Sequence, residues 1–124
     1  MILVDTNILI EIYRDNQSII EKVRSIGQGN IAVSVITSAE LMYGARNKNE
    51  LQTILKDLKK ISVLNLDNEI SIKFGQLIEK YALSHKLSLP DALIAATAIC
   101  RNLQLYTLNT KDFKYIKDVK LFEI

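Results

Sequence analysis

Short, wholly apolar runs alternate along this chain with longer segments whose apolar residues recur at helical spacing. The short runs show no alternation with polar residues, which is typical of strands that are buried on both faces. The longer segments place apolar residues three and four positions apart, which predicts amphipathic helices. Predicted strands are 1–4, 31–35, 61–66, 104–108 and 120–122; predicted helices are 6–13, 19–26, 38–43, 50–60, a long helix after Asp67, and 91–101.

Strands that alternate with helices favour a parallel sheet covered on both sides by helices. The chain has no internal repeat, no linker-like stretch and no shift in composition that would mark a boundary. We therefore expect one α/β domain over residues 1–124, in three layers, with a central, mostly parallel sheet of four to five strands flanked by helices.

Composition excludes several classes of protein. Of the 124 residues, 48% are hydrophobic and 24% charged, values typical of a globular domain rather than a disordered chain. A single cysteine excludes an internal disulfide framework and Cys-rich zinc sites. No apolar run approaches the roughly 20 residues that span a bilayer, and the amino terminus lacks the features of a signal peptide. We expect a cytoplasmic protein that does not associate with membranes.

Four acidic residues fall at the carboxyl ends of predicted strands or in the first turns of helices that follow. Asp5 comes directly after the first strand, and Glu40 is expected in the first turn of the helix after the second. Asp91 lies in the first turn of the most apolar helix, and Asp112 in the loop after strand 104–108. Because ligands of open parallel sheets bind beyond the carboxyl ends of the strands, these four side chains are expected to face one crevice.

Each acid on its own also has a purely structural explanation. The segment 37–40 matches a capping box, in which Glu40 would serve only the start of its helix. Asp91 follows a proline and would interact favourably with a helix dipole, Asp5 could cap the next helix, and Asp112 could lie in a solvated turn. None of these explanations accounts for the shared placement of all four acids at one rim.

Four short motifs in a fixed order carry a family resemblance. They are Val4-Asp5-Thr6-Asn7, Ser38-Ala39-Glu40-Leu41 followed by Gly44, Pro90-Asp91-Ala92-Leu93-Ile94-Ala95-Ala96, and Thr107-x-Asn109-x-x-Asp112-Phe113. Over residues 2 to about 122, the sequence resembles the PIN-domain ribonucleases, and most of all the small VapC-type toxins of bacterial toxin–antitoxin pairs.

This resemblance implies an endoribonuclease that hydrolyses RNA phosphodiester bonds and leaves a 5′-phosphate. It also implies a homodimer and a cognate antitoxin that inserts an Arg or Lys near the acidic site. The residues that match the family's catalytic, metal-binding carboxylates are Asp5, Glu40, Asp91 and Asp112; those that match its supporting polar positions are Thr6, Asn7, Thr107 and Asn109.

A divalent cation suits such a group of acids. Two carboxylates about 5 Å apart repel each other by roughly 3 kcal/mol at an effective dielectric near 20, so four require a cation or protons. Oxygen ligands without His or Cys favour Mg²⁺, or Mn²⁺, over zinc. The net charge is +2, and sixteen basic residues against the remaining ten acidic ones leave +6 outside the crevice, which suits a polyanion such as RNA.

Basic residues that could contact RNA lie near the motifs. Arg14 and Arg46 flank the first two motifs and are candidates for contact with the RNA backbone. Four lysines also recur at every third position towards the end of the chain, either as a solvated face or as an edge that guides phosphates: Lys111, Lys114, Lys117 and Lys120.

Two other functions remain open. One is a receiver-like binding module that uses Asp67, after the third strand, as a phosphoacceptor, although Thr6 stands where such modules carry a second acid. The other is a catalytically inactive fold that only binds RNA or protein. His85 is the only histidine, which excludes a two-histidine ribonuclease mechanism within one chain. Cys100 lies in the most apolar helix and is expected to be a packed thiol.

Overall fold

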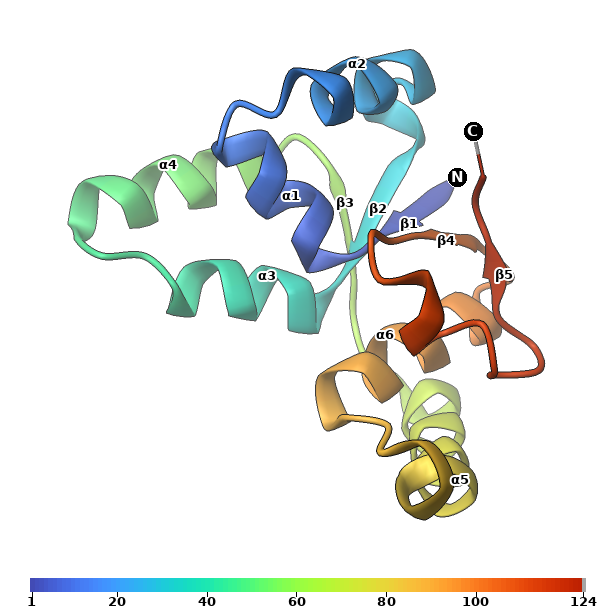
Figure 1. Ribbon diagram of the computed structural model, residues 1–124. Helices are drawn as coiled ribbons and strands as arrows, with labels where there is room; N and C mark the ends of the chain where they lie inside the picture. Colours follow the sequence, from blue (N-terminus) through green and yellow to red (C-terminus); the bar gives the residue numbers. More distant parts are fainter. Residues whose placement is uncertain (124) are drawn as a thin grey trace.

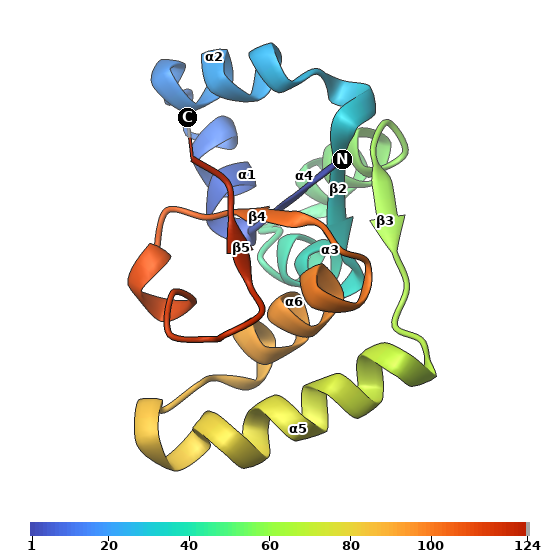
Figure 2. The same ribbon diagram turned by 90° about the vertical axis from the view of Figure 1, so that its right-hand side faces the viewer.

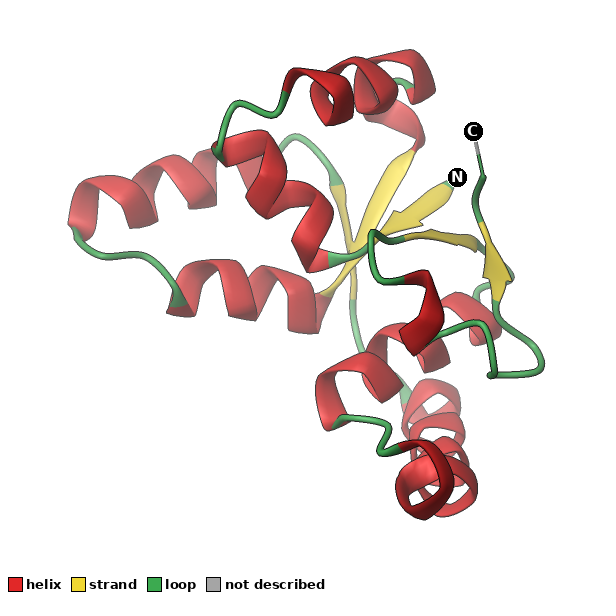
Figure 3. Cartoon of the chain, viewed as in Figure 1, coloured by secondary structure: helices red, strands yellow, loops and turns green. Residues whose placement is uncertain are grey.

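The computed structural model of the chain describes residues 1–123 and shows a five-stranded sheet with helices on both faces (Figures 1 and 3). All strand pairs are parallel, in the order β3-β2-β1-β4-β5. The elements along the chain are β1 (Ile2–Val4), α1 (Thr6–Tyr13), α2 (Gln17–Ile26), η1 (Gln28–Asn30), β2 (Ile31–Ser34), α3 (Val35–Tyr43), α4 (Lys48–Leu58), β3 (Ser62–Leu64), α5 (Asn68–His85), α6 (Leu89–Cys100), β4 (Gln104–Tyr106), η2 (Thr110–Asp112) and β5 (Lys120–Leu121).

Neighbouring residues of the central strands pack into two separate cores, one on each face of the sheet. On β1, Leu3 belongs to a core built with α5 and α6, whereas Val4 belongs to a core built with α1 and α2. On β4, Leu105 and Tyr106 divide in the same way. This two-sided burial explains why the strands are continuous apolar runs, and it confirms the predicted three-layer α/β fold (Figure 2).

Helix α6 is the most deeply buried helix, as its apolar sequence predicts. Four of its alanines are essentially inaccessible to solvent, and it packs between the sheet and the long helix α5. Small side chains along this helix allow its backbone to approach both neighbours closely. The start of α6 is thereby fixed relative to the ends of the strands, and Asp91 lies in its first turn, as expected.

The start of α3 differs from the sequence prediction. Strand β2 ends at Ser34, whose hydroxyl caps α3 by accepting a hydrogen bond from the Ile36 amide at 3.2 Å. The helix therefore begins at Val35, three residues before the expected start, and Glu40 lies in its second turn. The capping box proposed for residues 37–40 is wrong, because Glu40 is too far along the helix to satisfy its first amides.

Asp67 has a structural role in this fold. Its Oδ1 accepts from the amide of Ile70 at 2.9 Å and caps α5, while its Oδ2 pairs with Arg101 at 2.8 Å. Both oxygens are therefore engaged, which weighs against a phosphoacceptor. The thiol of Cys100 donates to the backbone carbonyl of Glu69 at 3.6 Å, a contact between α6 and α5.

Across residues 1–123, the structure contains no helix with the length and apolar character needed to cross a lipid bilayer.

The hydroxyl of Tyr106 gives a prediction about stability. Within the described residues, this buried oxygen has no hydrogen-bond partner, although its ring packs edge-on against Phe122. A buried, unpaired hydroxyl costs about 1 kcal/mol or more. We expect Tyr106→Phe to raise the free energy of unfolding in urea by about 1 kcal/mol; a loss of stability would mean that the hydroxyl is hydrogen-bonded in solution.

Candidate active site

Asp5 is the most rigidly held of the four predicted carboxylates. It ends β1 and caps α1, and its side chain is only 6% exposed. The Thr6 amide donates to its Oδ1 at 2.7 Å, and the Thr107 hydroxyl donates to its Oδ2 at 2.7 Å. Its own amide donates to the carbonyl of Tyr106 at 2.9 Å. Both carboxylate oxygens are thus oriented by donors that follow the ends of the neighbouring strands β1 and β4.

Glu40 is connected to the same strand end through a threonine. The Thr6 hydroxyl donates to Glu40 Oε1 at 2.8 Å and lies 2.9 Å from the hydroxyl of Thr37. Thr37 is completely buried, so this short chain of hydroxyls begins in the core and ends at the exposed Glu40. Sequence reasoning missed this role of Thr37, but its position three residues before Glu40, on the same helical face, is a usable signal.

Asp91 and Asp112 complete the group from the other side. Asp91 is half-buried near the start of α6, and Asp112 is the last residue of η2. The negative charges of Asp5, Asp112 and Glu40 all act on Asp91, and those of Glu40 and Asp112 act on Asp5. The four carboxylates therefore share one electrostatic environment at the carboxyl end of the sheet, as the strand order predicts.

The pKa values of two of these acids reflect this crowding. Burial raises the pKa of Asp5 above its ordinary value, against the opposing effect of the hydrogen bonds from Thr107 and Thr6, and neighbouring carboxylates raise it further. Burial, followed by the charge of Asp5, raises the pKa of Asp91 to about 6. Negative charge is therefore under-compensated in this crevice, which is the condition that a bound cation relieves.

The predicted supporting residues form a network around Thr107. Its hydroxyl accepts from the Asn7 side-chain amide at 3.4 Å and from the backbone amide of Asn109 at 3.1 Å. Asn7 in turn accepts from the amide of Leu108 at 3.3 Å. The start of α1 is thus tied to the loop after β4. Asn109 contributes its backbone rather than its side chain to this network.

The donor set fits an oxygen-seeking divalent cation with few protein ligands. Among residues 1–123, no three His, Cys, Asp or Glu side chains lie close enough together to surround a metal ion as they stand. A cation would therefore be held by fewer than three of the carboxylates, unless their side chains rotate. Mg²⁺ is commonly held by one or two carboxylates and retains several waters, so this arrangement suits it better than zinc.

The two arginines predicted to contact RNA line a groove that includes Glu40. This groove has a volume of about 610 Å³ and lies between α1, α3 and α4. Arg46 pairs with Glu50 at 2.9 Å, and Arg14 pairs more loosely with Glu11 at 3.6 Å. Both guanidinium groups lie at the surface near the site, and their contact with RNA stays a prediction.

Comparison with known proteins finds relatives over nearly the whole chain. A family model described as the PIN domain matches residues 2–119. Ribonuclease VapC10 of Mycobacterium tuberculosis is 34% identical over 122 residues, which cover 97% of this chain and 91% of the relative. Ribonuclease VapC1 of Methanocaldococcus jannaschii is 32% identical over 123 residues, which cover 97% of this chain and 84% of the relative.

Solved structures give the same result for the fold. A chain of a toxin–antitoxin complex from Klebsiella pneumoniae superposes with a TM-score of 0.82 at 34% sequence identity, and the match covers 100% of both chains. The α/β fold expected from the sequence is therefore shared over its whole length with a known protein of similar sequence.

Removing the charge of Asp91 should stabilise the metal-free protein. Its raised folded pKa means that folding is favoured as the pH falls from above 6 towards 4, where the unfolded carboxyl also becomes protonated. After a discount for solvent at this half-buried group, the charge costs about 1–2 kcal/mol at pH 7. This exceeds the roughly 0.3–1 kcal/mol that an acid contributes at a helix start. We expect Asp91→Asn to raise the melting temperature in EDTA at pH 7.

The same variant should weaken the increase in stability between pH 7 and pH 5, because it removes a group that titrates there. Asp15→Asn is the matched control, since Asp15 is exposed in the turn after α1 and its positive φ suits asparagine. Equal effects of the two substitutions at pH 7 would contradict the interpretation that the crevice is destabilised by its own negative charge.

Proposed function

Because the chain belongs to the PIN-domain family, we propose that it is a Mg²⁺-dependent endoribonuclease and the toxin of a cytoplasmic toxin–antitoxin pair. Its match to the family model over residues 2–119 and its ribonuclease relatives support RNA as the substrate. The observation that carries the proposal is the orientation of Asp5 and Glu40 by hydroxyl groups at a strand end where the charges of Asp91 and Asp112 also act. Mn²⁺ has the same ligand chemistry and is the alternative cation.

The proposed reaction is hydrolysis. Water attacks phosphorus, the bond from phosphorus to the 3′-oxygen breaks, and the products carry a 3′-hydroxyl and a 5′-phosphate. A bound divalent cation supplies a lowered water pKa and neutralises charge that develops on the phosphate oxygens. Asp5, Glu40 and Asp91 would hold it once their side chains rotate toward one another, with Asp112 as a further ligand or as the residue that holds a second ion.

The hydroxyl groups act as positioning residues in this proposal. Thr107 and the Thr6 amide fix the rotamer of Asp5, so its oxygens keep their direction when substrate arrives. Thr6 does the same for Glu40. Without a cation, the four carboxylates would repel the phosphodiester, since each pair of like charges about 5 Å apart costs roughly 3 kcal/mol. Binding of a productive phosphate is therefore coupled to binding of the cation.

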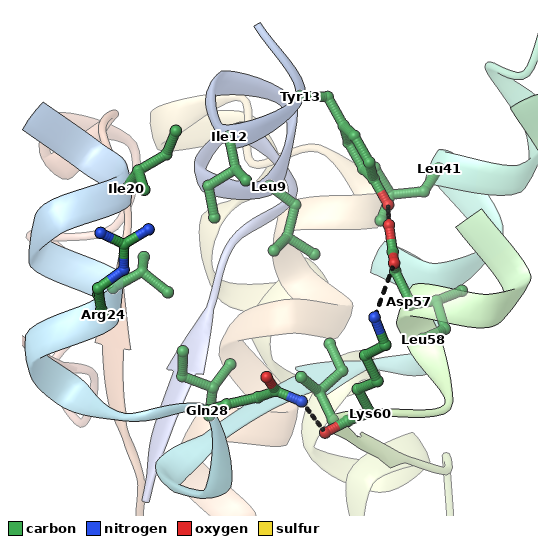
Figure 4. A pocket seen from close by; sticks show the side chains of 13 residues that line it. Leu9, Ile12, Tyr13, Ile20, Arg24, Gln28, Leu41, Asp57, Leu58 and Lys60 are labelled. Carbon is green, nitrogen blue, oxygen red and sulfur yellow. Dashed lines mark hydrogen bonds and ion pairs between the residues drawn. The ribbon is translucent and has the colours of Figure 1, made fainter. Parts of the chain in front are cut away.

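An apolar groove beside the Glu40 groove supports a protein partner (Figure 4). Leu9, Ile12, Ile20, Leu41 and Leu58 line its sides, and its volume is about 420 Å³. Tyr13 spans its rim and donates to Asp57 at 2.8 Å. Tyr13 and Leu41 also line the groove that contains Glu40, so the two grooves adjoin at these residues.

One extended partner can therefore occupy both grooves. A helix with an apolar face fits the first groove, and a following basic segment would reach the carboxylates. The similar Klebsiella pneumoniae chain comes from a toxin–antitoxin complex, so we propose that this partner is the cognate antitoxin, with an Arg or Lys near the acids. A homodimer, implied by the family resemblance, stays a prediction; sedimentation at micromolar concentration tests it.

Cleavage of RNA is the direct test of the proposed activity. The purified protein should cleave total RNA in Mg²⁺, stop in EDTA and recover on addition of excess Mg²⁺ or Mn²⁺. Asp5→Asn should lower the rate by at least about 100-fold, because it removes a charged oxygen from the cation site. Thr107→Val should lower it by about 10- to 100-fold, as expected when a residue that orients a ligand is lost.

Two controls make this test specific. Asp15→Asn removes a carboxylate outside the crevice and should cleave at the normal rate, and melting temperatures should show that all variants fold. The ends of the products should carry 5′-phosphate. Activity that persists in Asp5→Asn, or that does not depend on a divalent ion, would contradict the proposed mechanism and leave the catalytically inactive binding module as the better interpretation.

The partner groove gives a separate prediction. When the chain is coexpressed with its neighbouring gene, Ile20→Asp should abolish copurification of a small partner, because it places a charge in the apolar groove. Leu83→Asp is the matched control, since Leu83 is 91% exposed on α5 and lies outside both grooves. Equal retention of the partner by both variants would show that it binds elsewhere.

A further inference from the structure

Three aromatic rings form a stack where the end of α5 meets the segment after η2. His85 stacks on Tyr115, with ring centroids 4.0 Å apart and planes inclined by 9°. Tyr81 packs edge-on against both rings, at 5.6 Å from His85 and 5.1 Å from Tyr115. Tyr81 is buried, Tyr115 is half-buried and His85 is exposed. The stack therefore begins in the core and ends at the surface in an imidazole ring.

The exposed ring of this stack is held in place by its neighbours. The Ser84 hydroxyl lies 2.7 Å from His85 Nδ1, which fixes the ring together with the stacking on Tyr115. The Lys117 amide lies 3.5 Å from the Tyr81 hydroxyl, so the segment after η2 is anchored against α5. A ring that is already ordered loses little conformational entropy when a ligand stacks on it.

Four lysines lie in the segments that form the stack. Lys80 Nζ lies 5.4 Å from the centre of the Tyr81 ring, and Lys86 directly follows His85. Lys114 precedes Tyr115 in sequence. Within the 123 residues that the structure describes, none of these lysines forms an ion pair, and neither does Lys117. All four are exposed and outnumber the acids next to them in sequence, Glu79 and Asp118.

This aromatic–lysine face lies near the predicted carboxylate site. It consists of Tyr81, His85, Tyr115, Lys80, Lys86, Lys114 and Lys117. Tyr115 follows Asp112 by three residues, and His85 precedes Asp91 by six. Burial and then the charges of Asp91 and Asp112 raise the pKa of the Tyr115 hydroxyl, which agrees with this closeness. Figure 2 shows the end of α5 and the segment after η2 on the same side of the molecule.

We propose that the aromatic–lysine face binds the single-stranded RNA next to the scissile phosphate, with one unpaired base stacked on His85 and the lysines at the phosphates. The proposal rests on the proposed nuclease function. It adds the path of the RNA strand across the surface and the requirement that this strand be unpaired. Stacking on an aromatic ring requires a base that is free of its own stack, which selects single-stranded segments.

The structure also divides the periodic lysines that the sequence left open. Lys120 Nζ donates to the Asn102 side chain at 3.0 Å beside β5, so it is engaged away from the aromatic rings. Lys114 and Lys117 flank Tyr115 in sequence, and the backbone amide of Lys117 reaches the Tyr81 hydroxyl of the stack. Of these lysines, only Lys114 and Lys117 are therefore assigned to RNA binding.

Charge reversal tests the lysines. A labelled single-stranded RNA of about 12 nucleotides is titrated in EDTA, and its anisotropy reports binding without cleavage. The double substitution Lys114→Glu and Lys117→Glu should weaken RNA binding by about tenfold. It should also reduce the magnitude of the slope of log K against log salt concentration by about 1.4. Lys22→Glu with Lys56→Glu makes the same change in net charge on α2 and α4 and should stay within about twofold.

The stacking contact is tested separately at His85. His85→Ala should weaken binding of the single strand by about fivefold or more, whereas His85→Phe retains a ring and should restore it. Binding of a duplex of the same sequence should not respond to either substitution. If His85→Ala and His85→Phe weakened RNA binding equally, stacking on the ring would be ruled out. If the two lysine pairs weakened RNA binding equally, a specific role of Lys114 and Lys117 would be ruled out. Either result would overturn the proposal.

These results remain distinguishable from failure of the nuclease proposal. If the wild-type protein cleaves RNA in Mg²⁺ and all variants of the aromatic–lysine face bind RNA normally in EDTA, the nuclease proposal stands and the proposed RNA-binding face is overturned. A wild-type protein that neither binds nor cleaves RNA overturns both. Variants that bind weakly and show a raised KM with unchanged kcat support the face as a binding surface outside the reacting atoms.

Discussion

The hydrogen bond from the Thr107 hydroxyl to Asp5 Oδ2 joins residues 102 positions apart and holds the site together. It exists only because β1 and β4 are parallel neighbours whose carboxyl ends finish at the same level. Once this bond is made, the Asp5 carboxylate is fixed between two strands, and Thr6 extends the same order to Glu40. The other three carboxylates interact with this fixed, buried charge, so its position determines the electrostatics of the site.

The sheet explains why acidic side chains lie beyond the carboxyl ends of its strands and not along the strands themselves. Both faces of the central strands are buried, so a polar side chain along a strand would lose its hydration without a partner. Where the strands end, helix starts and hydroxyls supply donors that offset this loss. Asp5 is tolerated at 6% exposure because two donors reach its oxygens, and its pKa is raised because these hydrogen bonds do not fully offset the effect of burial.

The sequence was sufficient to predict the elements and the two-sided sheet, because buried strands and helix periodicity are local patterns. The predicted acids Asp5, Glu40, Asp91 and Asp112 lie near enough for their charges to interact, but among residues 1–123 no three of them are close enough to surround a metal ion. It misplaced the start of α3, since Ser34 and Thr37 are equally good caps and tertiary packing chose between them. The hydroxyl contact between Thr6 and Thr37 spans 31 positions. No local pattern encodes such a contact, although the spacing of Thr37 and Glu40 places both residues on one face of α3.

Charge is separated within this small protein, and the separation bears on substrate selection. An acidic crevice alone repels RNA, whereas the lysines beside His85 attract it, so the strand is held next to the carboxylates before a phosphate enters between them. Electrostatic attraction by itself would accept any nucleic acid. The exposed ring of the His85–Tyr115 stack adds a contact that only an unpaired base can make, which converts a general attraction into a preference for single-stranded segments.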